Sequence, residues 1–236
     1  METLLAASGI DKIFRRPQGD LKVLDGCGIE LAADGATAIT GPSGAGKSTL
    51  LNILGALDRP DAGEILFRGE AITGWKNERL AAWRRHHVGF IFQFHFLLPD
   101  FTALENILLP VRIAGGDHRE ARPRAEWLLQ RMELADRADH LPGQLSGGEQ
   151  QRVAVARAFI GSPAIVMADE PFGNLDREKG ERISRMLAEL RAECGAALVL
   201  VTHDLTLAGR ADRRLDLREG RLHVVDSDSE RIEPQD

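Results

Sequence analysis

Apolar residues in this chain fall into short runs that alternate with longer amphipathic segments. Four mostly apolar runs have the length of buried strands and lie at residues 36–40, 88–92, 164–168 and 197–201. The spacing or composition of the intervening segments predicts helices at residues 47–57, 77–87, 125–132 and 178–194. Strands that alternate with helices in this way predict an α/β fold around a doubly wound sheet.

Other parts of the chain have a different pattern. Residues 3–40 combine short β-like runs with turn signals, which predicts an antiparallel β layer, and a strand at 64–68 is expected to return to it. Residues 94–150 are predicted to form a mostly helical insertion with its own small core. Near the end, residues 213–225 read as a hairpin that turns at Glu219 and Gly220.

A candidate phosphate-binding loop follows the first buried run. It fits the pattern G-x-x-x-x-G-K-[ST] and consists of Gly41, Pro42, Ser43, Gly44, Ala45, Gly46, Lys47, Ser48 and Thr49. Glycines let successive backbone N–H groups point at an oxyanion, and the following helix adds the positive end of its dipole. In this pattern Lys47 reaches the β- and γ-phosphates and Ser48 a Mg²⁺ ion. The bare pattern arises by chance in about one such chain in a hundred, so a plain Gly-rich turn is the lesser alternative.

Polar residues follow the other three buried runs, at the strand ends where ligands of doubly wound sheets bind. Gln93 either binds the Mg²⁺ or its water, or simply begins a loop. Asp169 and Glu170 are adjacent carboxylates, which are costly to bury without a cation or hydrogen-bond donors. We expect Asp169 to hold the metal through its water and Glu170 to polarise the water that attacks the γ-phosphate, a solvated turn being the alternative. His203 follows the last run.

Two further features are ambiguous by themselves. Ser146, Gly147 and Gly148 precede a predicted helix and indicate either a second anion-binding helix N-terminus or a simple helix cap. Phe14 has the flat ring needed to stack on adenine, although an aromatic residue in a β layer more often belongs to the core.

Composition narrows the class of protein. The net charge of -6 over 236 residues argues against a nucleic-acid partner bound by broad phosphate neutralisation. Two cysteines do not make a disulfide framework, and the N-terminus lacks a charged-then-apolar leader, so a cytoplasmic setting is expected. The longest apolar runs, such as residues 196–201, are far shorter than the roughly 18 residues that span a bilayer. We therefore expect no transmembrane segment, and any membrane association to come through a partner.

The assembled motifs resemble the ATPase subunits of ATP-binding cassette (ABC) transporters over nearly the whole chain. The phosphate loop, Gln93, the run LSGGEQQR at 145–152, the Asp169–Glu170 pair and His203 occur in the order of that superfamily. The resemblance implies a P-loop NTPase (RecA-like) core with an antiparallel β layer and an inserted helical subdomain. We expect the nucleotide-binding core at 1–92 and 153–225, the helical subdomain with the signature motif at 93–152, and a polar tail at 226–236.

The resemblance also implies roles for single residues. Gln93 would be the Q-loop residue and His203 the switch histidine, both in the catalytic group with Glu170. Phe14 would stack on the adenine of ATP, in place of the commoner Tyr. Residues 174–176 would form the D-loop. Two subunits are expected to pair head to tail when ATP binds, so that the motif of one caps the γ-phosphate held by the other, and this motif comprises Ser146, Gly147, Gly148 and Glu149.

Several runs are similar to the branch that serves lipoprotein release, macrolide-type efflux and cell-division permeases. The run at 89–106 is most similar to the ATPase subunits of lipoprotein-releasing (Lol) complexes, whereas Phe172 departs from the branch's usual Thr. This implies a peripheral ATPase on the cytoplasmic face of the inner membrane, which drives a permease in the release of lipoproteins toward the outer membrane. The alternative is the ATPase of a macrolide or peptide efflux or cell-division permease complex.

Other classes fit less well. A non-transport ABC ATPase usually carries a long coiled-coil insertion or a second cassette, and neither is present. A module that holds ATP without hydrolysing it is disfavoured by the presence of Glu170 and His203. The stretch at 94–109 clusters apolar residues in a loop-rich segment, so we expect it to be the docking surface for the inner-membrane permease. The alternative is that these residues form the private core of the insertion.

Overall fold

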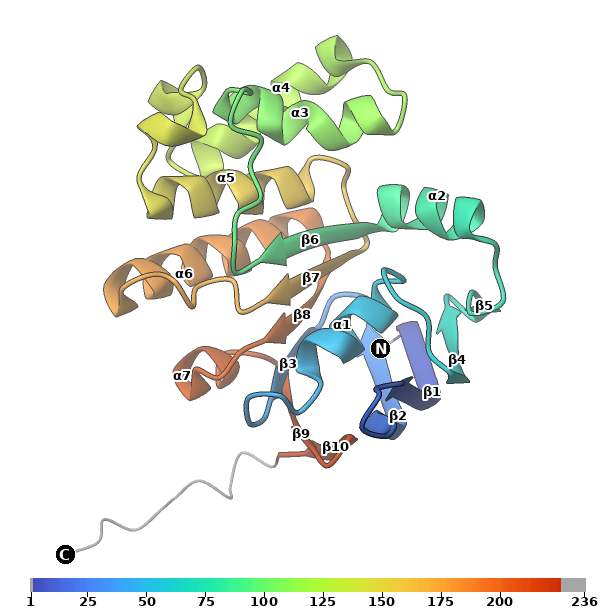
Figure 1. The fold of residues 1–236 in the computed structure, drawn as a ribbon. Coiled ribbons are helices and arrows are strands. Elements are labelled where there is room, and N and C mark those ends of the chain that lie inside the picture. The colour runs from blue at the N-terminus through green and yellow to red at the C-terminus, as the bar shows by residue number, and fades with distance from the viewer. Residues whose placement is uncertain (1, 226–236) are drawn as a thin grey trace, which may run out of the picture.

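The computed structural model describes residues 2–225 and contains two sheets with helices around them (Figure 1). The larger sheet has the strand order β10-β9-β3-β8-β7-β6, in which only the terminal pair β10-β9 is antiparallel. Its strands are β3 (Ala36–Thr40), β6 (Val88–Phe92), β7 (Ile165–Asp169), β8 (Ala197–Val201), β9 (Arg213–Arg218) and β10 (Arg221–Val224). The predicted α/β class and the hairpin at 213–225 are confirmed.

The smaller sheet is the antiparallel β layer, with the order β2-β1-β4-β5. Its strands are β1 (Thr3–Phe14), β2 (Leu21–Ala32), β4 (Ala62–Phe67) and β5 (Glu70–Ala71). The two short runs expected at 21–24 and 29–31 belong to the single long strand β2. Register shifts along the β1–β2 ladder let these long strands stay paired around Gly9 and Gly26, which both have positive φ.

Seven helices occur in the described residues. They are α1 (Lys47–Leu54), α2 (Asn77–His87), α3 (Ala103–Ile113), α4 (His118–Arg131), α5 (Gly147–Phe159), α6 (Arg177–Cys194) and α7 (Leu205–Ala208). Two 3₁₀ turns, Ala135–Arg137 and Pro142–Gln144, connect α4 to α5. The predicted helix at 47–57 is shorter than expected because it ends at Gly55. The expected domain boundary at 152 falls inside α5, and the tail predicted at 226–236 lies outside the described residues.

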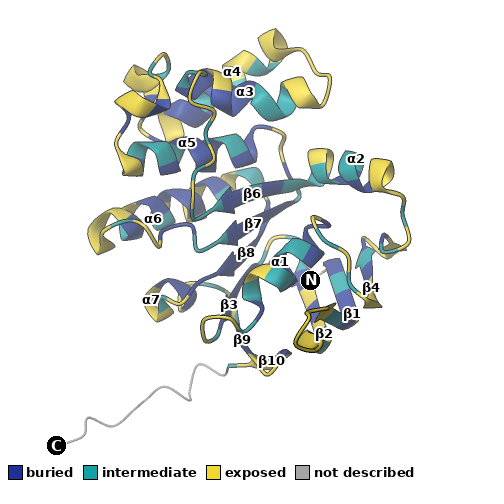
Figure 2. Cartoon of the chain, viewed as in Figure 1, coloured by how far each residue is buried: buried dark blue, intermediate teal, exposed yellow. Residues whose placement is uncertain are grey.

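Two apolar clusters cover the two faces of the larger sheet, and the strands alternate between them. In β7, Ile165 and Met167 face the cluster formed with α1 and the β layer, while Val166 and Ala168 face the cluster of α3 to α6. The helical insertion therefore shares one continuous core with α6 and the sheet, and the expectation of a separate small core is wrong. Figure 2 shows the buried strands between exposed outer helix faces. Within residues 2–225, no helix is both long and apolar enough to cross a bilayer.

Candidate functional site

The candidate phosphate loop joins β3 to α1 and is packed tightly against β9 of the larger sheet and β2 of the β layer. A Cβ atom on Gly41 would lie 2.4 Å from the carbonyl oxygen of Leu217, and one on Gly46 would lie 2.6 Å from Val23 Cγ1. Both residues also have positive φ, 139° and 100°. A larger residue at either position would push the loop away from its neighbours, so these two glycines fix the backbone that presents its N–H groups.

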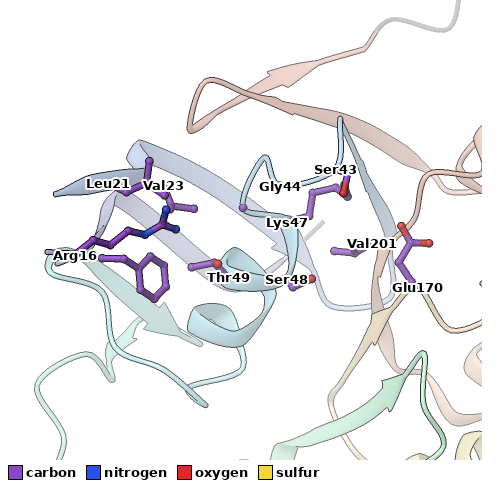
Figure 3. A pocket seen from close by; sticks show the side chains of 12 residues that line it. Arg16, Leu21, Val23, Ser43, Gly44, Lys47, Ser48, Thr49, Glu170 and Val201 are labelled. Carbon is purple, nitrogen blue, oxygen red and sulfur yellow. The ribbon is translucent and has the colours of Figure 1, made fainter. Parts of the chain in front are cut away.

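Lys47 lies over this loop rather than in solvent. Its Nζ donates to the carbonyl oxygens of Gly41 and Pro42, at 2.9 and 3.0 Å. A cavity of about 420 Å³ opens beside it and is lined by residues from both sheets and the loop (Figure 3). The lining residues include Phe14, Arg16, Leu21, Val23, Ser43, Gly44, Gly46, Lys47, Ser48, Thr49, Glu170 and Val201. The cavity thus brings together the phosphate loop, the aromatic ring and the carboxylate, all of them predicted from the sequence.

One end of this cavity contains residues that the sequence did not single out. Arg16, Leu21 and Val23 gather on the β layer, while Glu170 and Val201 lie at the opposite end (Figure 3). Phe14 is 39% exposed, and Lys12 Nζ lies 5.6 Å from its ring centre. An exposed ring with apolar and cationic neighbours can stack on a base. Only the pairing of β1 with β2 places Arg16 and Val23 at the pocket, because nothing in their local sequence marks them.

Asp169 ends β7 and its side chain meets the hydroxyl of Ser48. Burial raises the pKa of the Asp169 carboxyl, the Ser48 hydrogen bond opposes this, and the charges of Glu170 and Lys47 act in opposite directions. The Oδ1 atom of Asp169 is buried without a hydrogen-bond partner among residues 2–225, which is unusual for a carboxylate. Proteins commonly hold Mg²⁺ through one or two carboxylates together with substrate phosphates. The arrangement fits a Mg²⁺ that arrives with a nucleotide.

No complete metal site made by the protein alone accompanies this carboxylate. In the described part of the chain, no three His, Cys, Asp or Glu side chains come together in a way that could hold a metal ion. A cation held by Asp169 would therefore need further ligands, such as phosphate or water.

Glu170 follows directly and contacts the predicted switch histidine. His203 Nδ1 lies 3.0 Å from Glu170 Oε2, while the backbone N–H of Glu170 donates to the carbonyl oxygen of Val201 over 2.9 Å. The Glu170 side chain is only 19% exposed, whereas that of His203 is 73% exposed. Glu170 lines the cavity beside the phosphate loop and is held by β8 and the loop after it.

Gln93 follows β6 and its side chain contacts the D-loop. Its Nε2 donates to Asn174 Oδ1, and Asn174 Nδ2 donates to the carbonyl oxygen of Gln93, both at 3.1 Å. On the other side, Arg157 of α5 donates to the carbonyl oxygens of His95 and Phe96, at 2.7 and 2.8 Å. The segment after β6 is thus attached both to the loop after β7 and to α5. Sequence analysis identified neither Asn174 nor Arg157 as a partner of this segment.

The second predicted anion site begins α5, in the helical part of the molecule. Ser146 caps the helix: its hydroxyl accepts from the N–H of Glu149 and donates to the Glu149 carboxylate, whose Oε2 also accepts from the Ser146 N–H. These hydrogen bonds from Ser146 lower the pKa of Glu149. Within this chain the capping arrangement is complete, as in an ordinary capping box. The phosphate loop and this helix end come from different parts of the fold.

The stretch expected to dock a partner divides into two parts. Phe94 and Phe96 are each 64% exposed, and Leu98 is 39% exposed. By contrast, Leu104 and Ile107 of α3 are buried in the cluster of α3 to α6. The exposed large apolar side chains of the stretch therefore lie within residues 94–98, and the apolar residues of α3 support the core.

The aromatic rings of this segment form a continuous row. Phe90 stacks on Phe92, Phe92 meets Phe96 edge to face, and Phe96 contacts Phe94, with centroid distances of 5.7, 5.6 and 6.4 Å. A neighbouring groove of about 310 Å³ is lined by Phe90, Phe92 and three arginines, which are Arg84, Arg85 and Arg157. Burial lowers the pKa of Arg84 and of Arg157. The aromatic row and the arginine groove together form a surface that is both apolar and cationic.

Comparison with known proteins agrees with these features. A family model described as ABC transporter matches residues 24–173. The lipoprotein-releasing system ATP-binding protein LolD of Idiomarina loihiensis is 46% identical over 222 residues, which is 94% of this chain and 97% of that protein. The LolD protein of Porphyromonas gingivalis is 49% identical over 209 residues, 89% of this chain and 95% of that protein. A solved dimer of the ATP-binding cassette MJ0796 bound to ADP and Pi has a TM-score of 0.85 and 37% identity, and the match covers 93% of this chain and 96% of that one.

Proposed function

This chain belongs to the ABC transporter family, and we propose that it is the ATP-hydrolysing motor subunit of a permease complex that releases lipoproteins from the inner membrane. The lipoprotein assignment is supported by the LolD relatives, which match nearly end to end. We place the subunit at the cytoplasmic face of that membrane, where ATP is available and where a partner must supply the attachment.

One observation carries the hydrolase assignment. Glu170 lines the same cavity as Lys47 and Ser48, and directly follows Asp169, whose buried oxygen lacks a partner. A metal-binding carboxylate and a neighbouring base on one side of a phosphate loop are the arrangement needed for hydrolysis of a nucleoside triphosphate. Because the relatives and the solved cassettes bind adenine nucleotides, ATP is the proposed substrate.

Polar groups of the phosphate loop and of the strand ends have distinct tasks in this reaction. Lys47 would neutralise charge on the β- and γ-phosphates, while Ser48 and Asp169, together with Gln93, would hold the metal or its water. Mg²⁺, when bound, stabilises the negative charge that develops on the phosphate oxygens. Glu170 would orient the attacking water and accept its proton as the bond between γ-phosphorus and the leaving oxygen of ADP breaks. His203, which meets Glu170, would sense the γ-phosphate.

We propose that ATP completes each site by joining two copies of the chain. The Ser146 helix end lies on α5, in another part of the fold from the phosphate loop, and its capping box engages the N–H groups of Ser146 and Glu149. A second copy placed head to tail would bring this end, including Gly147, Gly148 and Glu149, to the γ-phosphate. The cassette dimer with ADP and Pi is a precedent for such pairing in a related protein.

We propose that the aromatic row and the arginine groove dock the permease. A cytoplasmic segment of a permease with apolar side chains and a carboxylate would suit this surface, because guanidinium groups that become buried in a complex are stabilised by an opposite charge. The exposed part of the row begins at Phe94, one residue after Gln93, so docking and the state of the γ-phosphate would influence the same segment.

The proposed function is tested with Glu170→Gln. The amide cannot accept the proton, so hydrolysis of ATP should fall by about 100-fold or more while ATP still binds. Light scattering on this variant should show twice the molecular mass with Mg-ATP as without it, because trapped ATP keeps the dimer closed.

Lys47→Ala separates binding from chemistry in the same assay. Removing its charge should weaken nucleotide binding itself, and the mass should then stay at that of one chain. Hydrolysis by Glu170→Gln at the parent rate, with nucleotide bound, would show that another group orients the water. Lipoprotein release is tested independently by identifying the permease that co-purifies from solubilised membranes.

A further inference from the structure

The chemistry of the groups involved shows which atoms of the Gln93 and Asn174 amides donate hydrogen bonds and which accept them. A backbone carbonyl oxygen only accepts hydrogen bonds, so the Asn174 atom that lies 3.1 Å from the carbonyl of Gln93 must be its NH₂ group. The oxygen Oδ1 of Asn174 is then turned toward the side chain of Gln93. That oxygen can only accept, so the group of Gln93 that faces it, also at 3.1 Å, must be its NH₂.

This chain of donors and acceptors determines which end of the Gln93 amide stays available. With its NH₂ group held by Asn174, the Oε1 atom of Gln93 is turned away from the D-loop. Amide oxygens are ligands for Mg²⁺ and acceptors for its bound water, whereas the NH₂ group is neither. A glutamine without such a partner presents either end, because the two amide orientations have the same shape.

The backbone around the pair brings the two loops close together. A Cβ atom on Gly173 would lie 3.2 Å from Gln93 Nε2, closer than most such contacts, so glycine gives the amide room to reach Asn174. The N–H of Gly173 also donates to the carbonyl oxygen of Glu170 over 3.1 Å. The short turn at 170–174 therefore carries the proposed base Glu170, the glycine that lies close to Gln93, and Asn174, the hydrogen-bond partner of Gln93.

We propose that Asn174 is a positioning residue that orients the amide of Gln93 so that Oε1 faces the metal or its water. The inference rests on the proposed function, because it assumes that Gln93 acts on the nucleotide's metal. It assigns Asn174 a role inside its own subunit, acting through Gln93. Arg157 fixes the backbone after Gln93 from the opposite side, which leaves the amide orientation to Asn174.

The test measures nucleotide binding by calorimetry, with Glu170→Gln present in every protein so that ATP is not consumed. ATP is titrated in the presence of Mg²⁺ and, separately, in EDTA. Asn174→Ala removes both hydrogen bonds, whereas Asn174→Asp loses the NH₂ group but keeps an oxygen that can accept from the NH₂ group of Gln93. Asn174→Ala should weaken binding of Mg-ATP by about 2- to 10-fold, the value of one neutral hydrogen bond, Asn174→Asp should weaken it less, and both should leave binding in EDTA unchanged. Glu178→Gln, an exposed change in the first turn of α6, should alter neither value.

A double-mutant cycle with Gln93→Ala decides whether Asn174 acts through Gln93. Without the Gln93 amide, the Asn174 variants should lose no further Mg²⁺-dependent binding. An equal loss in EDTA, or the same loss with and without Gln93, would instead indicate an effect on dimer contacts and would overturn the inference. If Gln93→Ala leaves the Mg²⁺ dependence unchanged, the proposed role of Gln93 fails and the inference with it. The hydrolase assignment is judged separately, by the turnover of Glu170→Gln.

Discussion

Glu170 adopts a left-handed backbone conformation, with φ of 44°, directly after the last residue of β7. This conformation costs about 1 kcal/mol or more for a residue with a Cβ atom, and it persists where the surrounding structure fixes it. Here the N–H of Glu170 is bonded to Val201 of the neighbouring strand, and its carboxylate meets His203. We infer that the turn is retained because it keeps the carboxylate at the wall of the nucleotide cavity.

The two cysteines have contrasting environments, and their thiols should therefore differ in reactivity. Cys27 is 1% exposed, its thiol donates to the carbonyl oxygen of Gly220 over 2.7 Å, and burial raises its pKa to about 11. Cys194 at the end of α6 is partly exposed. Because the thiolate is the reactive form, iodoacetamide at about pH 8 should label Cys194 alone in the folded protein.

Intact-mass measurement over time checks this prediction. One adduct is expected in the native protein and two after unfolding in denaturant, with Cys194→Ser giving none under native conditions. A raised pKa means that little thiolate forms at Cys27 until the pH approaches 11, so moving from pH 7 to 9 should still leave Cys27 unlabelled. Native labelling of Cys27 at a similar rate would contradict the buried, hydrogen-bonded thiol.

At the scale of single elements, helices α3 and α5 both begin with a capping box. Thr102 caps α3 and pairs reciprocally with Glu105, as Ser146 does with Glu149 in α5. In α3 the box also orders the residues just after the exposed aromatic segment. Helix α5 also carries Arg157, whose guanidinium group donates to backbone carbonyl oxygens of that segment. The buried side chains of α5 pack in the cluster of α3 to α6. A shift of α5 would therefore displace the segment after β6, to which Arg157 is hydrogen-bonded.

The capping box of α3 predicts a pH-dependent contribution to stability. Hydrogen bonds from the backbone and side chain of Thr102 lower the pKa of Glu105 below its ordinary value of 4.5. A lowered folded-state pKa means that the contribution is present above pH 4.5 and is lost as the pH falls through the lower, folded value. Glu105→Gln keeps an acceptor but removes the charge, so it should cost about 0.5 kcal/mol at neutral pH.

Urea unfolding of the parent and of Glu105→Gln, across a range from neutral to acid pH, measures this contribution. The difference in unfolding free energy should shrink toward zero in acid. Arg122→Gln on the exposed face of α4 is a control, since its pairing with Glu126 lies outside the box. A difference that stays constant down to the lowest pH would show that the charge of Glu105 does not stabilise α3.

At the scale of the whole molecule, the exposed aromatic row predicts where the permease binds. Phe94→Glu and Phe96→Glu each replace an aromatic ring by a charged carboxylate on a surface that we expect to become buried in the complex. Each should prevent co-purification of the permease from solubilised membranes while the melting temperature of the isolated subunit stays nearly unchanged, because both rings are mostly exposed.

Val224→Glu provides a matched control. Val224 is 61% exposed, close to the 64% of Phe94 and Phe96, but it lies on β10, at the opposite edge of the larger sheet from β6. This variant should assemble normally. A lowered melting temperature of the Phe94 or Phe96 variants with assembly intact would indicate that the rings support the core rather than the complex.

The sequence by itself determined the fold class, several elements and the chemistry of the site. Short apolar runs predicted β3, β6 and β8 with their observed bounds, and helical composition predicted α2 likewise. These predictions succeeded because a strand buried on both faces must be apolar throughout, which leaves a strong local signal. The phosphate loop and the polar residues after the strands were equally visible, because their residue types are required by the chemistry of phosphate and metal binding.

Only the tertiary structure decided how distant segments meet. It placed Arg16 and Val23 at the cavity, paired Gln93 with Asn174 and Arg157 with the segment after β6, and merged the helical insertion into one core with α6. It also divided the stretch at 94–109 into an exposed row and a buried helix. Local sequence could not decide these points, because the type of a residue does not show whether its side chain contacts solvent, the core or another loop. That neighbour is chosen by the packing of segments far apart in the chain, where burial of apolar area and satisfaction of buried polar groups are decided together.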